Sequence, residues 1–167
     1  MGNIPTRSRF TRNMLLPGET GSGMSLRSEP FELTGESVAT VELTKDTFED
    51  TILSNDIVLV DFWAEWCGPC RFFAPVYEKV SEQYPDLVFA KVDTEAEREL
   101  ASYFNIRSIP TLMIFRDDIG IFSQPGALPE DALTDVIGRA QKVDMEEVRR
   151  QIKDKDAHDA ASPRRSR

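Results

Sequence analysis

The chain has 167 residues, of which 40% are hydrophobic and 29% are charged, and its formal net charge is −9. This length suffices for one folded domain with a core and terminal extensions, and no apolar run approaches the ~18 residues that would predict a membrane span. Residues 38–141 carry most of the negative charge, with 8 Lys and Arg against 19 Asp and Glu. A domain of this charge repels nucleic acid and anionic membranes, so we expect neither as a partner.

Residues 1–37 are expected to be a disordered extension, because they are rich in Gly, Ser and Thr and show no sustained apolar period. Arg7, Arg9 and Arg12 faintly resemble the basic part of an organelle transit peptide, but a disordered tail is the simpler interpretation. A secretory signal would need an apolar stretch of ~7–15 residues, and the apolar residues 14–16 are too few. We therefore expect the protein to be cytoplasmic.

The first predicted elements are a short strand over residues 38–43, where apolar and polar side chains alternate, and the helix that follows it. Thr44 can cap this helix, because its hydroxyl oxygen can accept a hydrogen bond from an unpaired N–H of the first turn. Phe48, Ile52 and Leu53 predict the face of the helix that packs on the core.

Residues 57–63 form a nearly continuous apolar run, which predicts a central strand covered on both faces. The only two cysteines of the chain, Cys67 and Cys70, follow this strand and stand at the start of a helix predicted over residues 67–84. Unpaired N–H groups and the helix dipole favour negative charge there, so a thiol at that point is expected to have a lowered pKa. A strand that delivers a Cys-x-x-Cys pair to a helix N-terminus predicts a redox site.

A thiolate is the species that attacks disulfides. We therefore expect Cys67 to be the nucleophile, with an ionised and accessible sulfur, and Cys70 to resolve the mixed disulfide. A structural disulfide is the alternative, but so short a loop removes little chain entropy and stabilises little. Two cysteines and one histidine cannot supply the four ligands of a structural zinc site, and we expect no metal and no cofactor beyond the redox-active pair.

The remaining elements follow from hydrophobic spacing. The helix over residues 67–84 contains Pro69 in its first turn, where a missing N–H costs nothing, and Pro75, which is expected to kink it. Its apolar residues at helical spacing are Phe72, Phe73, Val76, Tyr77 and Val80. Strands are predicted over residues 87–92, 112–115 and 119–123, with a short helix that starts at Thr94 and a last core helix that starts at Pro129.

Residues 60–70, Val-Asp-Phe-Trp-Ala-Glu-Trp-Cys-Gly-Pro-Cys, resemble the active-site segment of thioredoxins nearly residue for residue. The resemblance continues through residues 89–93, 106–111 and 125–128 and covers roughly residues 38–141. It implies an α/β thioredoxin fold, with a central mixed sheet of about five strands flanked by four helices and an extra C-terminal helix. Asp118 occupies a hairpin position where thioredoxins usually have glycine, and Asp adopts the left-handed backbone only at some cost.

Two charged residues interrupt the apolar strands. A carboxylate at Asp61 is costly unless it is paired, neutral or functional, and the residues alone also allow a strand-end side chain that reaches water. The resemblance implies that Asp61 is a buried acid with a raised pKa that moves a proton to or from Cys70. For Lys91, an outward-reaching side chain is the simple interpretation, whereas the resemblance implies that it lies near Asp61 and modulates its titration.

The resemblance also implies a substrate-docking surface made of Trp66, Ile109, Pro110 and Gly126. It implies that the Ile109–Pro110 bond is cis, where the alternative is an ordinary trans bond at the start of a strand. A cis bond turns the Ile109 backbone toward the active site, where it can pair with an extended substrate. Gly126 is either a plain turn glycine or, by resemblance, a close neighbour of Cys67.

After the domain, residues 142–156 are predicted to form a helical extension and residues 157–167 a disordered tail. Asp144 can cap the helix, and Met145, Val148 and Ile152 lie on one face of it. That narrow apolar face leaves three interpretations open: packing on the domain, contact with a partner, or a helix that is only marginally stable by itself.

The function that the resemblance implies is a monomeric protein disulfide reductase that maintains cell redox homeostasis. Gly68 and Pro69 would set the stiffness of the loop, and this pair matches reducing family members. The substrates would be disulfide-containing proteins, and an NADPH-dependent thioredoxin reductase would return the oxidised form to the dithiol. An oxidase or isomerase is one alternative, but it would need an oxidising compartment. A non-catalytic binding module with this fold is the other.

Overall fold

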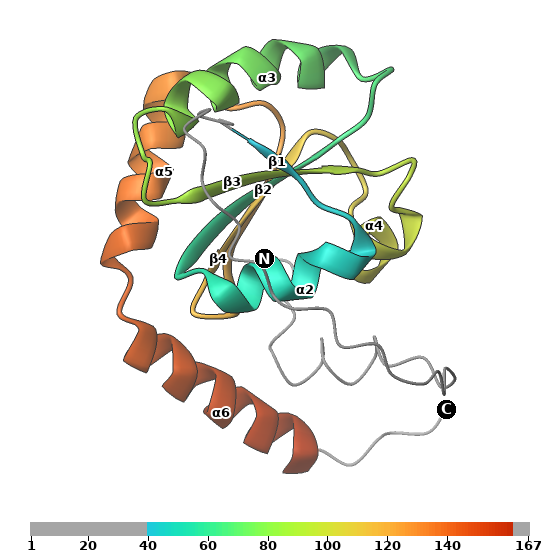
Figure 1. Cartoon of the computed structure of the whole chain (residues 1–167). Helices are drawn as coiled ribbons and strands as arrows, with labels where there is room; N and C mark the ends of the chain where they lie inside the picture. Colours follow the sequence, from blue (N-terminus) through green and yellow to red (C-terminus); the bar gives the residue numbers. More distant parts are fainter. Residues whose placement is uncertain (1–39, 162–167) are drawn as a thin grey trace, which may run out of the picture.

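The computed structural model describes residues 40–161, which form one five-stranded sheet with helices on both faces (Figure 1). The strands are β1 (Val41–Glu42), β2 (Ile57–Trp63), β3 (Val88–Asp93), β4 (Thr111–Arg116) and β5 (Ile119–Pro125). Their order in the sheet is β1-β3-β2-β4-β5. The first three strands in this order are parallel to one another. Strand β4 runs antiparallel to both of its neighbours, β2 and β5. The mixed sheet predicted from the sequence is therefore confirmed.

Five helices accompany the sheet: α2 (Lys45–Ser54), α3 (Gly68–Ser81), α4 (Arg98–Tyr103), α5 (Glu130–Lys142) and α6 (Met145–Ala161). Buried side chains of α2 and α4 share one core cluster with one face of the sheet, and those of α3 and α5 share a second cluster with the other face. The four helices that flank the sheet and the extra C-terminal helix match the predicted fold. No helix in residues 40–161 has the length and apolar character needed to cross a membrane.

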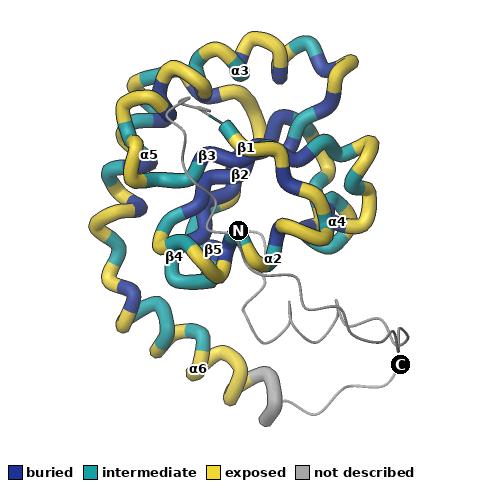
Figure 2. Tube along the Cα trace, viewed as in Figure 1, coloured by how far each residue is buried: buried dark blue, intermediate teal, exposed yellow. Residues whose placement is uncertain are grey.

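Strand β2 lies inside the sheet, and its side chains pack into the core on both faces. Val60 and Phe62 point into the core under α2 and α4, and Leu59 points into the core under α3 and α5. All three are fully buried, as the continuous apolar run predicted. Figure 2 shows the same pattern, with buried tube concentrated on the inner strands. This strand fixes the position of the cysteine pair that follows it.

Two predicted core residues lie at the surface instead. Leu53 is exposed, and the exposed fraction of Phe72 is 81%. Leu53 directly follows the buried Ile52, and Phe72 directly precedes the buried Phe73. Adjacent residues in a helix are rotated by about 100° around its axis, so a side chain next to a buried one points to a different side. Phe72 therefore points away from the side of α3 that packs on the sheet, and the prediction was wrong for both side chains.

Both predicted cap residues stand at the helix starts. Thr44 is the N-cap of α2, but the hydrogen bond found there runs from its own backbone N–H to Thr47 Oγ1 at 3.0 Å, and not from a first-turn N–H to the Thr44 hydroxyl as predicted. Asp144 precedes α6, and its Oδ1 accepts hydrogen bonds from the N–H groups of Glu146 and Glu147 at 3.0 and 3.2 Å. These bonds satisfy donors that have no partner inside the helix.

The β4–β5 hairpin turns through two aspartates with left-handed backbone. Asp118 has φ 66°, as its departure from glycine suggested, and Asp117 has φ 49°. The Asp117 N–H donates to the Asp56 carbonyl oxygen at 3.0 Å, and its carboxylate forms an ion pair with Arg149 of α6 at 2.8 Å. These contacts offset part of the cost of the left-handed geometry.

Helix α6 contacts the rest of the domain at this hairpin. Met145 is buried, and Arg149 reaches Asp117, so packing on the domain is the interpretation that its first turns favour. The helix runs to Ala161, five residues past the predicted end at residue 156. The predicted extension over residues 1–37 lies outside the described residues.

Candidate active site

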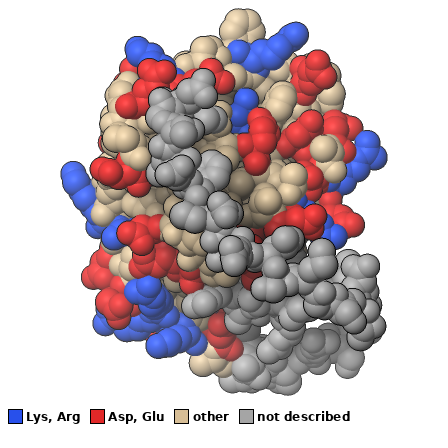
Figure 3. Space-filling model, viewed as in Figure 1, with Lys and Arg blue, Asp and Glu red and all other residues tan. Residues whose placement is uncertain are grey.

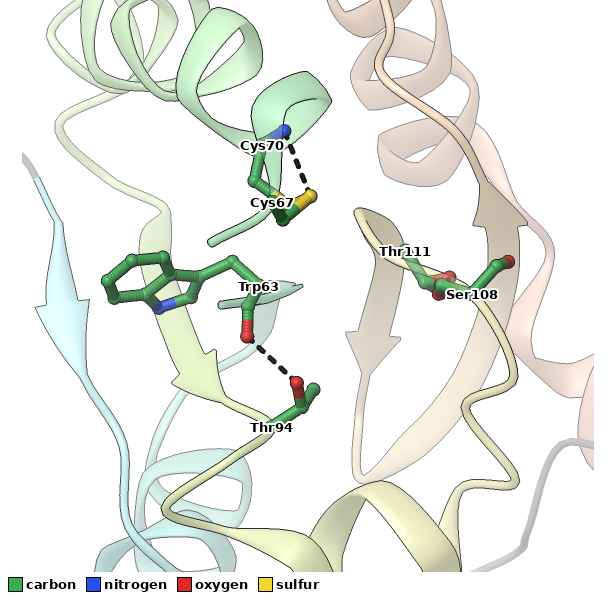
Figure 4. The surroundings of a disulfide bond; sticks show 6 residues. All are labelled: Trp63, Cys67, Cys70, Thr94, Ser108 and Thr111. Atoms are coloured by element: carbon green, nitrogen blue, oxygen red, sulfur yellow. Dashed lines mark hydrogen bonds between the residues drawn. A yellow bond between two sulfur atoms is a disulfide. The ribbon is translucent and has the colours of Figure 1, made fainter. Parts of the chain in front are cut away.

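The cysteine pair lies at the start of α3, after the short segment that connects it to β2. Cys67 is the N-cap of α3, and it forms a disulfide with Cys70, which lies in the first helical turn. The Cys70 backbone N–H donates to Cys67 Sγ at 3.2 Å (Figure 4). The sulfur of Cys67 therefore takes the place of a capping oxygen and accepts one of the N–H groups that a helix leaves unpaired.

The disulfide is more enclosed than the sequence led us to expect. Cys67 has an exposed fraction of only 3%, and Cys70 is equally buried. Ala64 belongs to the same buried cluster, and Trp63 and Ile109 pack against it. The expectation of an accessible sulfur is therefore wrong for the disulfide form, because the neighbouring strand end and the Ile109 turn cover it.

The turn before β4 faces the pair. The Ile109–Pro110 peptide bond is cis, as the resemblance implied. Thr111 Oγ1 donates to the Ser108 carbonyl oxygen at 2.7 Å, which closes this turn opposite the sulfurs in Figure 4. The Gly126 N–H donates to the Pro110 carbonyl oxygen at 2.7 Å, and Gly126 has φ 100°. Gly126 is thus joined to Pro110, and its positive φ is a conformation that other residues rarely adopt.

A groove of about 380 Å³ opens beside the pair. Its lining includes Trp66, Thr94, Ile106, Arg107, Ser108 and Ile109. It joins two of the predicted docking residues, Trp66 and Ile109, and Trp66 is among the most exposed apolar residues of the described chain. Thr94 and Arg107 were missed by sequence reasoning. Arg107 could have been found from its place two residues before Ile109, whereas Thr94 carries no local signal.

Thr94 is held against the end of β2. Its N–H and its hydroxyl both donate to the Trp63 carbonyl oxygen, at 2.9 and 3.0 Å (Figure 4). This pair of bonds ties the segment after β3 to the strand that leads into the cysteine pair, and it fixes one wall of the groove.

Asp61 lies inside the core below the pair. Its exposed fraction is 1%, and its Oδ1 has no hydrogen-bond partner within residues 40–161. Burial raises the pKa of this carboxyl to about 7, against the opposing attraction of Lys91, and the charge of Glu42 adds to the rise. The buried acid with a raised pKa that the resemblance implied is present, because β2 carries it under α3.

Lys91 stands beside Asp61 in the register of β2 and β3. Its side chain is mostly covered, and its Nζ lies 4.6 Å from the centroid of the Trp63 ring and 3.9 Å from Glu42 Oε1. The side chain thus reaches outward from Asp61 toward the exposed Glu42, and on its way its ammonium rests on an aromatic face.

The thioredoxin family model matches residues 39–139. The chain belongs to the thioredoxin family. A protein described as putative thioredoxin 2 from Streptomyces coelicolor is 63% identical over 119 residues, which cover 71% of this chain and 89% of that protein. Thioredoxin 1 from Synechococcus elongatus is 46% identical over 99 residues, which cover 58% of this chain and 92% of that protein.

Solved structures agree with this family. A mutant thioredoxin from Halobacterium salinarum matches with a TM-score of 0.56 and 38% identity over 59% of this chain and 87% of that chain. Plasmodium falciparum thioredoxin matches with a TM-score of 0.57 and 37% identity over 60% of this chain and 98% of that chain. All these matches leave a substantial part of this longer chain uncovered.

Thioredoxins are protein disulfide reductases, and the Cys67–Cys70 disulfide with Gly68 and Pro69 between the cysteines gives this chain the same redox centre. Dithiol–disulfide exchange is therefore its activity. Thioredoxins need no cofactor, because the redox group is part of the chain. Within residues 40–161, no cluster of three or more His, Cys, Asp or Glu side chains is arranged to hold a metal ion.

Proposed function

We propose that Cys67 and Cys70 divide the reduction of protein disulfides into two steps. The Cys67 thiolate attacks one sulfur of the substrate disulfide, and the other substrate sulfur leaves as a thiolate that takes up a proton. Cys70 then loses its proton and attacks Cys67 Sγ, which releases the second substrate thiolate and closes the Cys67–Cys70 disulfide. Two electrons pass to the substrate.

The hydrogen bond from the Cys70 N–H to Cys67 Sγ is the observation that carries this assignment. A donor aimed at a sulfur stabilises its thiolate and lowers its pKa, and the N-terminus of α3 acts in the same direction. Cys70 lies one turn further in, and no hydrogen bond to its sulfur is found within residues 40–161, so Cys67 is the attacking residue.

Asp61 is proposed to take the proton that Cys70 loses. With a pKa of about 7, both its protonated and its ionised forms are populated near neutral pH. A group with such a pKa can accept a proton during oxidation of the pair and return it during reduction. Lys91 beside it modulates this titration.

The substrate is proposed to dock along Trp66, Ile109, Pro110 and Gly126 and the groove next to them. Trp66 offers an exposed aromatic face, and the Ile109 turn packs against the sulfurs. An extended polypeptide around a disulfide suits this shape, because backbone atoms of the turn can pair with it as an added strand.

The proposed partners are disulfide-containing proteins and a thioredoxin reductase that regenerates the dithiol, as the family implies. We also propose that the protein works as a monomer in the cytoplasm. The acidic side chains spread over the face seen in Figure 3 do not favour nucleic acid as a partner.

Reduction of insulin disulfides by a dithiol tests the division of labour. We expect Cys67→Ser to abolish activity. Cys70→Ser should still attack but stop at a mixed disulfide that mass spectrometry detects. Rapid mixed-disulfide formation by Cys67→Ser through Cys70 would reverse the assignment. Equilibration with glutathione buffers separates the reductase from an oxidase or isomerase, and a reduction potential as high as that of a disulfide isomerase would reject the reductase.

A further inference from the structure

Three charged side chains form a row across the parallel half of the sheet. Glu42 on β1 is the register partner of Lys91 on β3, and Lys91 is the register partner of Asp61 on β2. Their chain neighbours Leu43, Ala90 and Val60 all belong to the core under α2 and α4. Because side chains alternate along a strand, the three charged residues share the opposite face, which α3 covers.

The row runs from the interior to the surface. Asp61 is buried, the side chain of Lys91 is 13% exposed, and that of Glu42 is 61% exposed. The Lys91 ammonium lies 3.9 Å from Glu42 and 4.6 Å from the centroid of the Trp63 ring. Asp61 Oδ1 has no hydrogen-bond partner among the residues that the structure describes. The single ammonium is therefore held at the outer side of the row.

We propose that Glu42 is a positioning residue for disulfide exchange: it draws the Lys91 ammonium toward the edge of the sheet and away from the Asp61 carboxyl. This rests on the proposed role of Asp61 as the proton acceptor of Cys70. Glu42 touches neither the sulfurs nor the substrate groove, and it acts through Lys91.

The carboxylates of Glu42 and Asp61 both attract the single ammonium of Lys91, and they have opposite effects on its position. Attraction by Lys91 lowers the pKa of Asp61, and the negative charge of Glu42 raises it. Removal of the Glu42 charge would act twice in the same direction, because the repulsion disappears and Lys91 is released toward Asp61.

The other groups that face Asp61 do not duplicate this effect. Burial raises the pKa of the Tyr77 phenol on α3, and the charge of Asp61 adds to the rise. This phenol donates its hydrogen bond to the Ala90 carbonyl oxygen at 3.0 Å. On β4 the register partner of Asp61 is Leu112, which is apolar. The cysteines do not titrate while they form a disulfide. Glu42 and Lys91 are thus the charged neighbours on which the titration of Asp61 depends.

The oxidised protein allows a direct test, because the sulfurs are silent and the Asp61 carboxyl can be followed by ¹³C NMR. We expect Glu42→Gln to lower the titration midpoint of Asp61 by about 0.5 pH unit, and Glu42→Lys to lower it further. Glu99→Gln is the matched control, since Glu99 is an exposed acid paired with Lys45, and it should leave the midpoint unchanged. High salt should shrink the shift, because Glu42 is exposed.

A second background tests whether Glu42 acts through Lys91. In Lys91→Met, the shift caused by Glu42→Gln should fall to less than half. An unchanged or raised midpoint in Glu42→Gln, or an equal shift with and without Lys91, would overturn the proposal.

Kinetics of the reduced protein separate this inference from the proposed function. Asp61→Asn should slow the step in which Cys70 resolves a mixed disulfide, and Glu42→Gln should move the pH profile of that step to lower pH. If Asp61→Asn leaves the step and its pH profile unchanged, the proton role of Asp61 fails. The proposal about Glu42 fails instead if Asp61→Asn slows the step and Glu42→Gln leaves the profile in place.

Discussion

The two ends of the sheet differ in whether their polar groups have hydrogen-bond partners. At the end that carries the cysteine pair, Asp61 Oδ1 and Trp63 Nε1 are buried without a hydrogen-bond partner among the described residues. At the hairpin end, Arg116 donates through Nη1 to the carbonyl oxygens of Ala140, Gln141 and Val143, at 2.8 to 3.0 Å. The active end keeps a buried carboxyl, Asp61, that can change its protonation, whereas Arg116 at the hairpin end hydrogen-bonds the last carbonyl groups of α5.

The C-terminal extension belongs to the second pattern. Figure 1 shows α6 beyond the end of α5, and Figure 3 shows basic side chains gathered in the same region of the view. The ion pair of Arg149 with Asp117 joins α6 to a turn whose backbone is strained at two consecutive positions. The difference between the two ends teaches that a cost in stability at the redox centre can be offset elsewhere in the same sheet.

The largest predicted effect concerns Asp61. The unfolded chain ionises this carboxyl above its ordinary pKa of 3.8, whereas the folded chain keeps it protonated up to about 7. The folded state therefore binds the extra proton in this window, and the free energy of unfolding falls as pH rises from about 4 to 7, by about 4 kcal/mol.

Urea unfolding of the oxidised protein at several pH values measures this loss. Asp61→Asn removes the titration, so its stability relative to the unmodified chain should rise by about 4 kcal/mol between pH 4 and pH 8. A difference that stays constant with pH would show that Asp61 is not held protonated, and the contrast between the two ends would disappear.

The next prediction concerns the hairpin end. Arg116→Met removes three hydrogen bonds to carbonyl groups at the end of α5, and we expect a loss of about 2 kcal/mol in the free energy of unfolding. Insulin reduction at 25 °C should be unchanged, because the change lies at the opposite end of the sheet. The matched control is Arg139→Met, which breaks only an exposed ion pair with Asp135 and should cost less than about 0.5 kcal/mol. Equal losses in the two variants would contradict the role of Arg116.

A smaller and opposite effect is expected at the turn itself. Asp118 has φ 66°, and glycine adopts this backbone without the steric cost that a side chain brings. Asp118→Gly should therefore raise the free energy of unfolding by about 0.5–1 kcal/mol, which would appear as a higher thermal midpoint. Asp118→Asn, which tolerates the same geometry, should change it less. A lower midpoint in Asp118→Gly would mean that contacts of the Asp118 side chain outweigh the strain.

The smallest effect is expected for the link between α6 and the hairpin. Arg149 is partly exposed, so Arg149→Ala should lower the free energy of unfolding by only about 0.5 kcal/mol. The loss should vanish in the Asp117→Asn background, because the partner charge is gone. A loss above about 2 kcal/mol would mean that α6 is held to the domain by more than this pair and Met145.

Sequence patterns predicted the local part of the site well and the assembled part poorly. The strand that delivers Cys67 to a helix N-terminus is written in adjacent residues, and the structure keeps it. The place of Asp61 in an apolar strand left open whether its side chain is buried or reaches water, and only the family resemblance implied that it is buried. Leu53 and Phe72 were assigned to the core because they are apolar and lie near the helical period, whereas in the structure their neighbours Ile52 and Phe73 take the buried positions.

The sequence by itself determined the strand and helix types, the place of the redox pair and the family, because those depend on hydrophobic period, capping and spacing within short segments. Only the tertiary structure decided that Trp66 and Arg107 line one groove, that Arg116 secures the end of α5, and that Glu42, Lys91 and Asp61 stand in one row. These contacts join residues far apart in the chain, and their meeting depends on strand order and register. No local pattern encodes that order, since it results from the packing of the whole sheet.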